Sequence, residues 1–495
     1  MKKIVIVGGG TAGLITAGLM NSYWGDDAQI RIIHDSNIKT IGVGESTTPI
    51  FMNVLQILNI ELKELISEID TTLKLGISFK DWIPGKEYFH GFSEIGEDND
   101  GFFRRTHDDS SAYYSILNGS FNGGENFSNP GIELPSDNFE SINAYAIHID
   151  TQRFTELLTK KLKERGVEFV DDLVERVRVN SECTEISHIE CRDSGIINAD
   201  FFVDASGFST ILFKHLNPSW IDTSNSLPID RAIPQQVPNT SGEIPAYTLS
   251  EATDNGWIWQ LPIGDRYGTG YLYSSKFTSD DEAKEKYNTW LLENHNVELT
   301  TDRVIKYRPG YYENYWIGNC MAVGLSSGFI EPLESTSMQL LSAQVYDFLV
   351  FNSTLNNLSF NQSHVNHSNR VKYEVIFNFI CLHYCTNRTD SKFWEYMTNN
   401  KIRWVKEFED KCNNEFIESS VFGGTKYAVF SYDSFVQIAD GLNLFNKDSL
   451  REWLIVKPNA QQILDISEQI YEPQQQYRTG NRWMSHKQVL DLNKY

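Results

Sequence analysis

A chain of 495 residues is long for a single hydrophobic core, so we expect at least two subdomains. Its formal net charge of −23 argues against nucleic acid and anionic membrane surfaces as partners, because both would repel it. Six cysteines in so long a chain argue against a disulfide framework, and no apolar run approaches the roughly 18 residues of a membrane span. We therefore expect a cytoplasmic protein.

The first 34 residues predict a strand, a tight glycine turn, a helix and a second strand. In "KIVIVGGGTAGLITAGLM", Gly8, Gly10 and Gly13 follow an apolar run with the spacing of a dinucleotide fingerprint. Gly8 permits the turn, Gly10 lets a pyrophosphate approach the backbone, and Gly13 lets the helix pack closely on the strand. The acid that usually binds the ribose after the second strand is displaced here. His34 and Asp35 both stand where it is expected.

Further along the chain, helical and extended patterns alternate with polar stretches. Residues 151–164 predict an amphipathic helix, and residues 196–208 predict a strand that enters a glycine turn. Composition predicts loops over three stretches, 94–101, 221–245 and 352–369.

From about residue 338 to the end, the pattern is mostly helical. "CLHYC" in this region holds Cys381, His383 and Cys385. No second cluster of ligands accompanies them, so they indicate thiols in a helix core and no metal site.

These elements predict an α/β fold. Residues 1–340 are expected to form a doubly wound, Rossmann-like dinucleotide-binding core with inserted β-sheet segments. Residues 341–495 are expected to form a mainly helical C-terminal region.

Two segments place unusual residues on predicted strands. In "WIWQLP" (257–262), Trp257 and Trp259 share one face of a strand that Pro262 ends, where they either fill a core or guard a redox site. In "TTLKLGISFKD", alternation turns Lys74 away from the face of Leu73 and Leu75. Taken alone, this pattern indicates a lysine on a solvent face.

Together, these motifs resemble the flavin-dependent halogenases, specifically the tryptophan halogenase-like group, from the N-terminus to about residue 395. The matching segments are "VIVGGGTAG", "GVGESTTP" (42–49), "LKLGISFKDW" (73–82), "YFHGF" (88–92), "HID" (148–150), "FVDASGF" (202–208), "GWIWQLP" with Leu261 in place of isoleucine, "YGTGYLYSS", "WIGNCMAVGLSSGFIEPLESTS" (316–337) and "RTD…FW" (388–394).

The resemblance implies a halogenase that uses reduced FAD from a separate flavin reductase, oxygen, and chloride, bromide or iodide. It also implies that residues 1–340 form an FAD-binding core of the two-dinucleotide-binding type with inserted strands on the substrate side, and that residues 341–495 close the substrate pocket. The hypohalous acid that forms passes through a tunnel to a small electron-rich aromatic substrate of the indole type. Lys74 becomes the catalytic lysine, acting as a haloamine or as a hydrogen-bond donor, and Glu334 the assisting glutamate. The FAD contacts implied are Gly8, Gly10, Thr11, Ala12, Gly13, His34, Val43, Glu45, Ser46, Val174, Asp204, Leu325 and Met338.

The remaining site residues concern halide and substrate. Pro332 fixes a turn before a helix start that would direct the backbone N–H groups of Thr336 and Ser337 at a halide, while Ser335 and Thr336 are candidate helix caps. The residues implied for the substrate side and the tunnel are His90, Trp257, Trp259 and Ser335. His90 also fits a satisfied core histidine. The tryptophan wall would bar an organic substrate from the flavin while a small halide enters.

Two departures from the family pattern bear on specificity. Ser337 stands where the family usually has glycine, and we expect a looser halide site that favours bromide or iodide over chloride. Phe435 and Val436 stand where tryptophan-7-type members carry clasping tyrosines, which argues against free tryptophan as the substrate. A flavin monooxygenase and a non-catalytic flavin-binding protein stay open as alternatives, as does a homo-oligomer.

Overall fold

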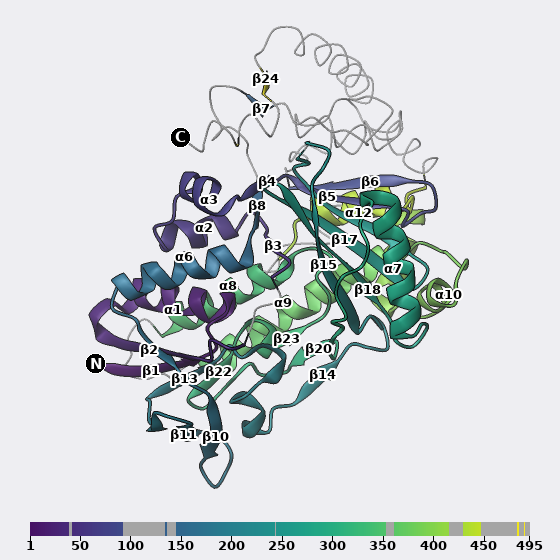
Figure 1. Cartoon of the computed structure of the whole chain (residues 1–495). Helices are drawn as coiled ribbons and strands as arrows, with labels where there is room; N and C mark the ends of the chain where they lie inside the picture. Colours follow the sequence, from purple (N-terminus) through teal and green to yellow (C-terminus); the bar gives the residue numbers. More distant parts are fainter. Residues whose placement is uncertain are drawn as a thin grey trace, which may run out of the picture. The chain divides into compact units, whose positions relative to one another are not determined.

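The computed structural model describes residues 1–38, 42–92, 134–135, 145–242, 244–352, 361–414, 429–446, 483–484 and 490 (Figure 1). The chain forms two compact units. Unit 1 comprises Met1–Asp70, Ile149–Asp230 and Ile305–Glu374, and unit 2 comprises Thr71–His148, Arg231–Val304 and Val375–Tyr495. Residue 340, the boundary expected from the sequence, lies inside a helix of unit 1. The loop predicted over 94–101 lies outside the described residues.

Unit 1 is built on a sheet with the strand order β21-β22-β13-β1-β2-β9. Its strands are β1 (Lys2–Val7), β2 (Ala28–His34), β9 (Glu168–Asp171), β13 (Phe201–Asp204), β21 (Trp316–Ile317) and β22 (Cys320–Ala322). All neighbours are parallel except β21 and β22. The order runs outward from β1 in both directions, so the carboxyl ends of β1 and β13 form the switch point where such sheets bind ligands. The strands predicted at the N-terminus and within 196–208 are confirmed.

Helices, two smaller sheets and two further short strands complete unit 1 (Figure 1). The helices are α1 (Thr11–Trp24), α2 (Phe51–Ile57), α3 (Leu62–Ile69), α6 (Thr151–Glu164), α8 (Thr336–Phe351) and the first part of α9 (Gln362–His383), with short 3-10 turns η1 (Gly25–Asp27), η3 (Gly207–Ser209), η4 (Phe213–Leu216) and η5 (Gly324–Ser326). The additional strands are β3 (Glu45–Ser46), β10 (Val174–Val179), β11 (Ile186–Cys191), β12 (Gly195–Ile197), β14 (Trp220–Asp222), β19 (Ile305–Lys306), β20 (Gly310–Tyr312) and β23 (Gly328–Phe329).

Helix α6 confirms the amphipathic helix predicted over 151–164. Phe154, Leu158 and Leu162 are buried on one face, as the spacing of apolar residues requires. The Asp150 carboxylate accepts a hydrogen bond from the backbone N–H of Arg153 at 3.0 Å, which caps the first turn.

The loop predicted over 352–369 is wrong from residue 362 onward, because α9 begins there. Asn366 accepts from the backbone N–H of Trp316 at 3.1 Å and donates to its carbonyl at 2.8 Å. Ser368 donates to the Asp347 carboxylate at 2.7 Å. Buried tertiary hydrogen bonds thus stabilise a helix in a stretch whose Asn and Ser residues favour turns on their own.

Unit 2 contains a sheet with the strand order β15-β18-β17-β16-β5-β6. Its strands are β5 (Gly76–Lys80), β6 (Glu87–Gly91), β15 (Arg231–Pro238), β16 (Thr248–Thr253), β17 (Gly256–Ile263) and β18 (Arg266–Tyr273). Two short pairs accompany it: β4 (Thr72–Lys74) with β8 (Ala146–Ile149), and β7 (Leu134–Pro135) with β24 (Trp483–Met484). Helix α7 (Asp280–His295) lies across one face of the sheet (Figure 1), where Ile258, Tyr271 and Tyr287 share one apolar cluster.

Two expectations about proline are corrected in this sheet. Strand β17 continues through Pro262 to Ile263. The Pro262 carbonyl accepts from the Thr72 hydroxyl at 2.7 Å, so this backbone edge faces away from β18 and the missing N–H breaks no bond with that strand. Similarly, β15 occupies part of the loop predicted over 221–245, because Pro234 and Pro238 pair in register with β18. The two prolines are an even number of residues apart and turn their nitrogens to the same edge.

The C-terminal part is mainly helical in the described residues, as predicted, apart from the short strand β24. It contains α10 (Lys392–Asn399), α11 (Arg403–Asn414) and α12 (Tyr432–Gly441) besides the end of α9. None of the six cysteines, all of which the structure describes, forms a disulfide bond. Over the described ranges, no helix is long and apolar enough to cross a membrane.

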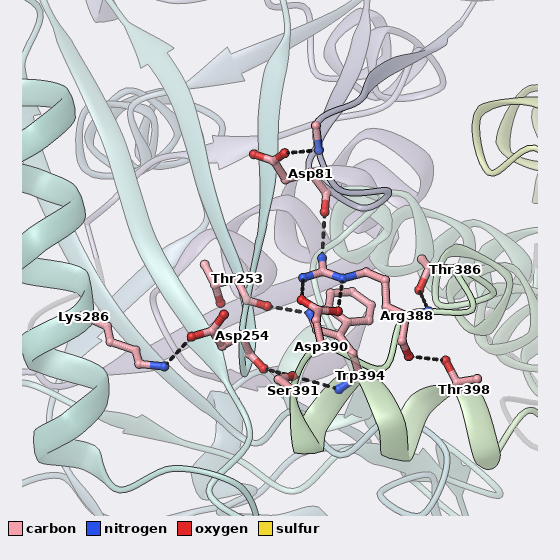
Figure 2. Close-up of polar contacts among 11 residues, drawn as sticks. Asp81, Thr253, Asp254, Lys286, Thr386, Arg388, Asp390, Ser391, Trp394 and Thr398 are labelled. Carbon is pink, nitrogen blue, oxygen red and sulfur yellow. Dashed lines mark hydrogen bonds and ion pairs between the residues drawn. The ribbon is translucent and has the colours of Figure 1, made fainter.

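Arg388 fastens the segment before α10 to the turn after β5. Its guanidinium binds Asp390 through two parallel hydrogen bonds of 2.9 and 2.6 Å. It also donates to the backbone carbonyl of Asp81 at 2.7 Å and lies 4.2 Å from the ring centroid of Trp394 (Figure 2). The bidentate pair holds the guanidinium in the orientation that this carbonyl needs.

The first turn of α10 is fastened to the β16–β17 hairpin in the same way. The Trp394 indole N–H donates to the carbonyl of Thr253 at 2.7 Å, and the Ser391 hydroxyl donates to the carbonyl of Asp254 at 2.6 Å (Figure 2). The Asp254 carboxylate meanwhile binds Lys286 of α7 at 2.8 Å. These contacts tie α10 to the main chain of the sheet.

Candidate active site

The glycine turn after β1 contains two glycines that the packing of the chain requires and one that it does not. Gly8 has φ +124°, and a Cβ there would lie 2.2 Å from the carbonyl oxygen of Ala205. A Cβ on Gly13 would lie 2.0 Å from the carbonyl oxygen of Gly8. A Cβ on Gly10 would meet no atom within 4 Å, and its φ of −81° suits any residue. The open backbone at Gly10, at the N-terminus of α1, therefore fits the space that a pyrophosphate requires.

His34 rather than Asp35 lies beside this turn with its side chain. A Cβ on Gly9 would be 2.7 Å from the His34 Cβ, so the two residues are in close contact. Asp35 instead accepts from the backbone N–H and the side-chain amide of Asn37, at 2.9 and 2.8 Å. This local turn engages the Asp35 carboxylate and favours His34 as the ribose-side residue.

Asp204 is fully buried at the carboxyl end of β13. One carboxylate oxygen accepts from the backbone N–H groups of Leu212 and Phe213 at 2.7 and 2.8 Å. The other accepts from the N–H and hydroxyl of Ser206 at 3.0 and 2.6 Å, and from the Ser326 hydroxyl at 3.2 Å. The carboxylate thus holds the loops at the switch point together, so a cofactor contact at Asp204 stays a prediction that concerns its backbone.

The segment at residues 42–46 contains two glycines with positive φ and a carboxyl group with a raised pKa. Gly42 and Gly44 adopt φ values of 70° and 90°, which only glycine adopts readily. Val43, Glu45 and Ser46 are all half-buried. Burial raises the pKa of Glu45 to about 7, so its carboxyl group is close to the midpoint of its titration at neutral pH.

The start of α8 confirms the predicted helix boundary. The Ser335 N–H donates to the carbonyl of Pro332 at 3.0 Å, and Ser335 adopts a left-handed conformation with φ 57°. Thr336 and Ser337 are the first two residues of the helix, and Glu334 is only 1 % exposed. The expected side-chain cap by Ser335 is not formed, because its left-handed backbone departs from the extended conformation of a capping serine. The backbone N–H groups of the first turn point outward along the helix axis.

Four further predicted FAD contacts lie around the switch point. Thr11 and Ala12 open α1, and a Cβ on Gly324 of η5 would lie 2.9 Å from the Ala12 Cβ. Leu325, in η5, therefore lies near the glycine turn. Met338 is buried in the first turn of α8. Val174 differs, because it packs on the apolar cluster of the sheet with Val5 and Ile33.

Lys74 is fully buried at the end of β4. Strand β4 pairs with β8, which places Lys74 opposite Ala146. At Leu75, whose N–H donates to the carbonyl of Ala246 at 2.7 Å, the chain leaves β4 and enters β5 in another sheet. The Lys74 Nζ lies 5.0 Å from the ring centroid of Phe92. The solvent-face interpretation is therefore wrong, because strand alternation here separates two buried sides. A fully buried lysine is rare outside functional sites.

The tryptophan pair shares one face of β17, as predicted. Trp257 and Trp259 stand opposite Leu272 and Gly270 of β18. A Cβ on Gly270 would lie 2.0 Å from the Trp259 ring, so the indole rests on the glycine backbone. Trp257 is buried, whereas Trp259 is half-buried.

His90 belongs to an aromatic region of unit 2. It is 3 % exposed, and its ring centroid lies 5.7 Å from that of Phe379 and 6.5 Å from that of Phe92. Phe435, suggested by the sequence as a replacement for a clasping tyrosine, packs 4.8 Å from Phe379 between helices. The side chain of Val436 lies outside the described residues.

Analysis of the sequence placed Phe92 in the segment of His90, but it missed Phe379, which contacts the His90 ring, and Phe430, which packs on Phe379. Phe379 and Phe430 come from segments 51 residues apart, yet their ring centroids are 3.9 Å apart. The available signal was the aromatic-rich segment "YEVIFNFICLHY", which only predicted a helix.

Comparison with known proteins agrees with this geometry. The family profile described as tryptophan halogenase matches residues 3–453. The chain is 32% identical over 364 residues to tryptophan 6-halogenase SttH of Streptomyces toxytricini, covering 68% of this chain and 69% of that protein. It is 29% identical over 439 residues to tryptophan 7-halogenase RebH of Lentzea aerocolonigenes, covering 83% of this chain and 81% of the relative.

Solved structures extend the likeness to the whole fold. Tar14, a tryptophan C-6 flavin-dependent halogenase (chlorinase) from taromycin biosynthesis, superposes with a TM-score of 0.86 at 25% identity, and the match covers 100% of both chains. The dinucleotide turn, the buried lysine strand and the tryptophan-bearing strand thus occur in a chain that matches this family along most of its length. The chain belongs to the tryptophan halogenase family and is a flavin-dependent halogenase.

Proposed function

We propose that the protein halogenates an electron-rich, indole-type aromatic substrate, using reduced FAD, oxygen and a halide by way of hypohalous acid. Reduced FAD comes from a separate flavin reductase. The bound cofactor supplies the activation of oxygen, and the residues of the chain supply binding, orientation and proton transfer.

The glycine turn and the switch point would hold the cofactor. The open backbone at Gly10 and the first turn of α1 suit its pyrophosphate. His34 would contact the ribose, and the segment with Val43, Glu45 and Ser46 would lie along the cofactor. Asp204 keeps the neighbouring loops in place.

The start of α8 would hold the halide. The first N–H groups of a helix carry partial positive charge, and Thr336 and Ser337 present theirs here. Ser337 adds a side chain where relatives usually have glycine. A looser site of this kind serves bromide and iodide better than chloride, because the larger halides are also oxidised more readily.

Lys74 and Glu334 would carry the halogenation itself. Complete burial of the Lys74 amine beside Phe92 is the single observation that supports this role most strongly. A charged amine would donate a hydrogen bond to hypohalous acid, and a neutral amine would take up the halogen. When the halogen replaces a ring hydrogen, the Glu334 carboxylate would accept the proton.

The aromatic surroundings of His90 support this substrate class. Phe92 and Phe379 lie around its ring, and aromatic side chains favour a flat aromatic ligand through stacked and edge contacts. The relatives SttH and RebH are named for their action on tryptophan. Here Phe435 is engaged in helix packing, which favours an indole-type substrate without the clasp for a free amino acid.

Mass spectrometry tests this function directly. We would incubate the protein with reduced FAD, oxygen and a panel of indole-type aromatics, with chloride, bromide or iodide in separate reactions. The expected products gain the mass of the added halide. Products that gain oxygen irrespective of halide would identify a monooxygenase, and FAD binding without any product would identify a flavin-binding protein.

A further inference from the structure

We propose that His148 is a positioning residue that fixes the strand carrying Lys74. The inference rests on the role proposed for Lys74. His148 belongs to the segment "HID", in which Asp150 caps α6. His148 itself is fully buried in unit 2 and has no part in the function described above.

Its hydrogen bonds have a defined direction. The Thr72 hydroxyl donates to the carbonyl oxygen of Pro262 at 2.7 Å and lies 3.0 Å from Nδ1 of His148. A hydroxyl has one hydrogen and a carbonyl oxygen only accepts, so Thr72 must accept from Nδ1–H of His148. In the neutral imidazole, Nε2 is then the acceptor, and the Thr248 hydroxyl lies 2.9 Å from it. The chain of donors therefore runs from Thr248 through His148 and Thr72 to Pro262.

This chain ends beside the catalytic candidate. Thr72 and Lys74 are two residues apart on β4, so their side chains leave the strand on the same side. Thr72 stands opposite His148, and Lys74 stands opposite Ala146. Strand β4 has only three residues and few ladder bonds of its own. A hydrogen bond at Thr72 therefore limits how far the backbone beneath Lys74 can move.

The same chain ties two segments of the proposed site together. Pro262 lies on β17, three residues after Trp259, and Thr248 begins β16. The strand that carries Lys74 is thus fastened to the strand that carries the tryptophan pair, through three side chains and one backbone carbonyl from four separate strands. Misplacement of a reacting group by about 1 Å can cost about 100-fold in rate.

Loss of the link should uncouple halogenation from flavin oxidation. In His148→Ala, we expect FAD binding and the reoxidation rate of reduced FAD to stay unchanged. The amount of halogenated product per reduced FAD oxidised should fall about 10- to 100-fold. A purely structural role would instead lower melting temperature, FAD binding and reoxidation together, and that pattern would overturn the inference.

Two amide variants identify the critical nitrogen. His148→Asn places an amide N–H near the position of Nδ1 and should restore most of the coupling through Thr72. His148→Gln places its amide near Nε2 and should not. Restoration by Gln and not by Asn would overturn the proposed direction. His295→Ala is the matched control, since this histidine contacts Gln260 of β17 at 2.7 Å away from Lys74, and it should couple normally.

Three further results decide between the inference and the proposed function. Normal coupling in His148→Ala, alongside loss of product in Lys74→Ala, would overturn the inference alone. Normal halogenation by Lys74→Ala would overturn the proposed role of the lysine instead. If His148→Ala fails to fold, Thr72→Val removes the same link with a side chain of similar shape, and normal coupling in that variant would overturn the inference.

Discussion

The glycine turn of unit 1 and the lysine strand of unit 2 are both tightly packed, but they are held by different stretches of chain. Gly8, Gly10 and Gly13 lie in one strand-turn-helix unit, with distant contacts at Ala205 and Gly324. Strand β4 and the adjoining Leu75 have their partners at Phe92, Ala146, Ala246 and Pro262, up to 190 residues away.

Substitutions in the two regions should therefore have different consequences. The local motif can lose its ligand while the rest of the unit stays folded, because the open position at Gly10 is not needed for packing. The lysine strand depends on long-range bonds, so small changes around it should alter the outcome of the reaction before they abolish flavin chemistry.

The largest expected effect comes from Lys74→Ala. Halogenation should fall about 10²- to 10⁴-fold, as for the loss of a group that takes part in the reaction. FAD binding and reoxidation should persist, because Lys74 belongs to the lysine strand and not to the glycine turn. Product mass and flavin absorbance measure the two. Lys80→Ala is the control, since Lys80 is partly exposed on β5 and pairs with Glu251; equal loss in both variants would contradict the assignment.

Gly10→Val and Gly13→Ala should break the local motif in two ways. Gly10→Val fills the open space and should abolish FAD binding, while the apoprotein loses at most about 1 kcal/mol for a poorer helix cap. Gly13→Ala forces a Cβ to 2.0 Å from a backbone oxygen and should also destabilise the apoprotein by about 1–3 kcal/mol. Flavin absorbance and denaturation measure both effects. Stoichiometric yellow flavin in Gly10→Val would refute the cofactor site.

Ser337→Gly should change halide choice by a smaller amount. Interactions at a helix N-terminus are worth about 0.3–1 kcal/mol, so we expect the ratio of brominated to chlorinated product to fall about two- to fivefold. Competition assays at equal chloride and bromide measure this ratio in both proteins. Dominant chlorination by the unmodified protein, unchanged in Ser337→Gly, would exclude this residue as the determinant.

The remaining expected effect concerns the pH dependence of stability at Glu45, and not the reaction. Its pKa is raised from 4.5 to about 7 in the folded protein, so the unfolded chain releases this proton first as pH rises. Glu45 therefore contributes a loss of stability between about pH 4.5 and about pH 7, and Glu45→Gln should remove that loss. Urea denaturation of the apoprotein at about pH 5 and about pH 8 measures it. Glu61→Gln, at an exposed position, should leave the pH profile of stability unchanged. If the profile of Glu45→Gln were identical to that of the unmodified protein, it would contradict the pKa shift.

The sequence predicted those parts of the molecule whose signals are local. The strand-turn-helix at Gly8–Gly13 and the helix start at Thr336 both appear as expected, because turn and helix-start residues act within a few positions of themselves. The family resemblance extended this prediction to Lys74 and Glu334, which spacing alone did not identify.

The failures share a physical cause, namely partners that lie far away in the sequence. Asn366 prefers turns, yet it forms helix because Trp316 offers both a donor and an acceptor. Pro262 would end an isolated strand, but β17 continues through it, and its carbonyl accepts a hydrogen bond from the Thr72 hydroxyl. Lys74 resembles a surface lysine until the strands around it are assembled. No pattern within ten residues contains this information.

The attachment of α10 has a consequence for protein engineering. Arg388, Ser391 and Trp394 bind the carbonyl groups of Asp81, Asp254 and Thr253, and every residue type carries a carbonyl. The two turns can therefore change their side chains without losing this attachment. A mutational library at residue 253 should retain the fold, whereas the three donor residues on the helical side should tolerate little variation. Asp81 and Asp254 are less free, because Asp81 has φ 59° and accepts from the backbone N–H of Gly85 at 2.9 Å, and the Asp254 carboxylate binds Lys286. The β16–β17 turn is thus a more suitable place to diversify the protein than the β5–β6 turn.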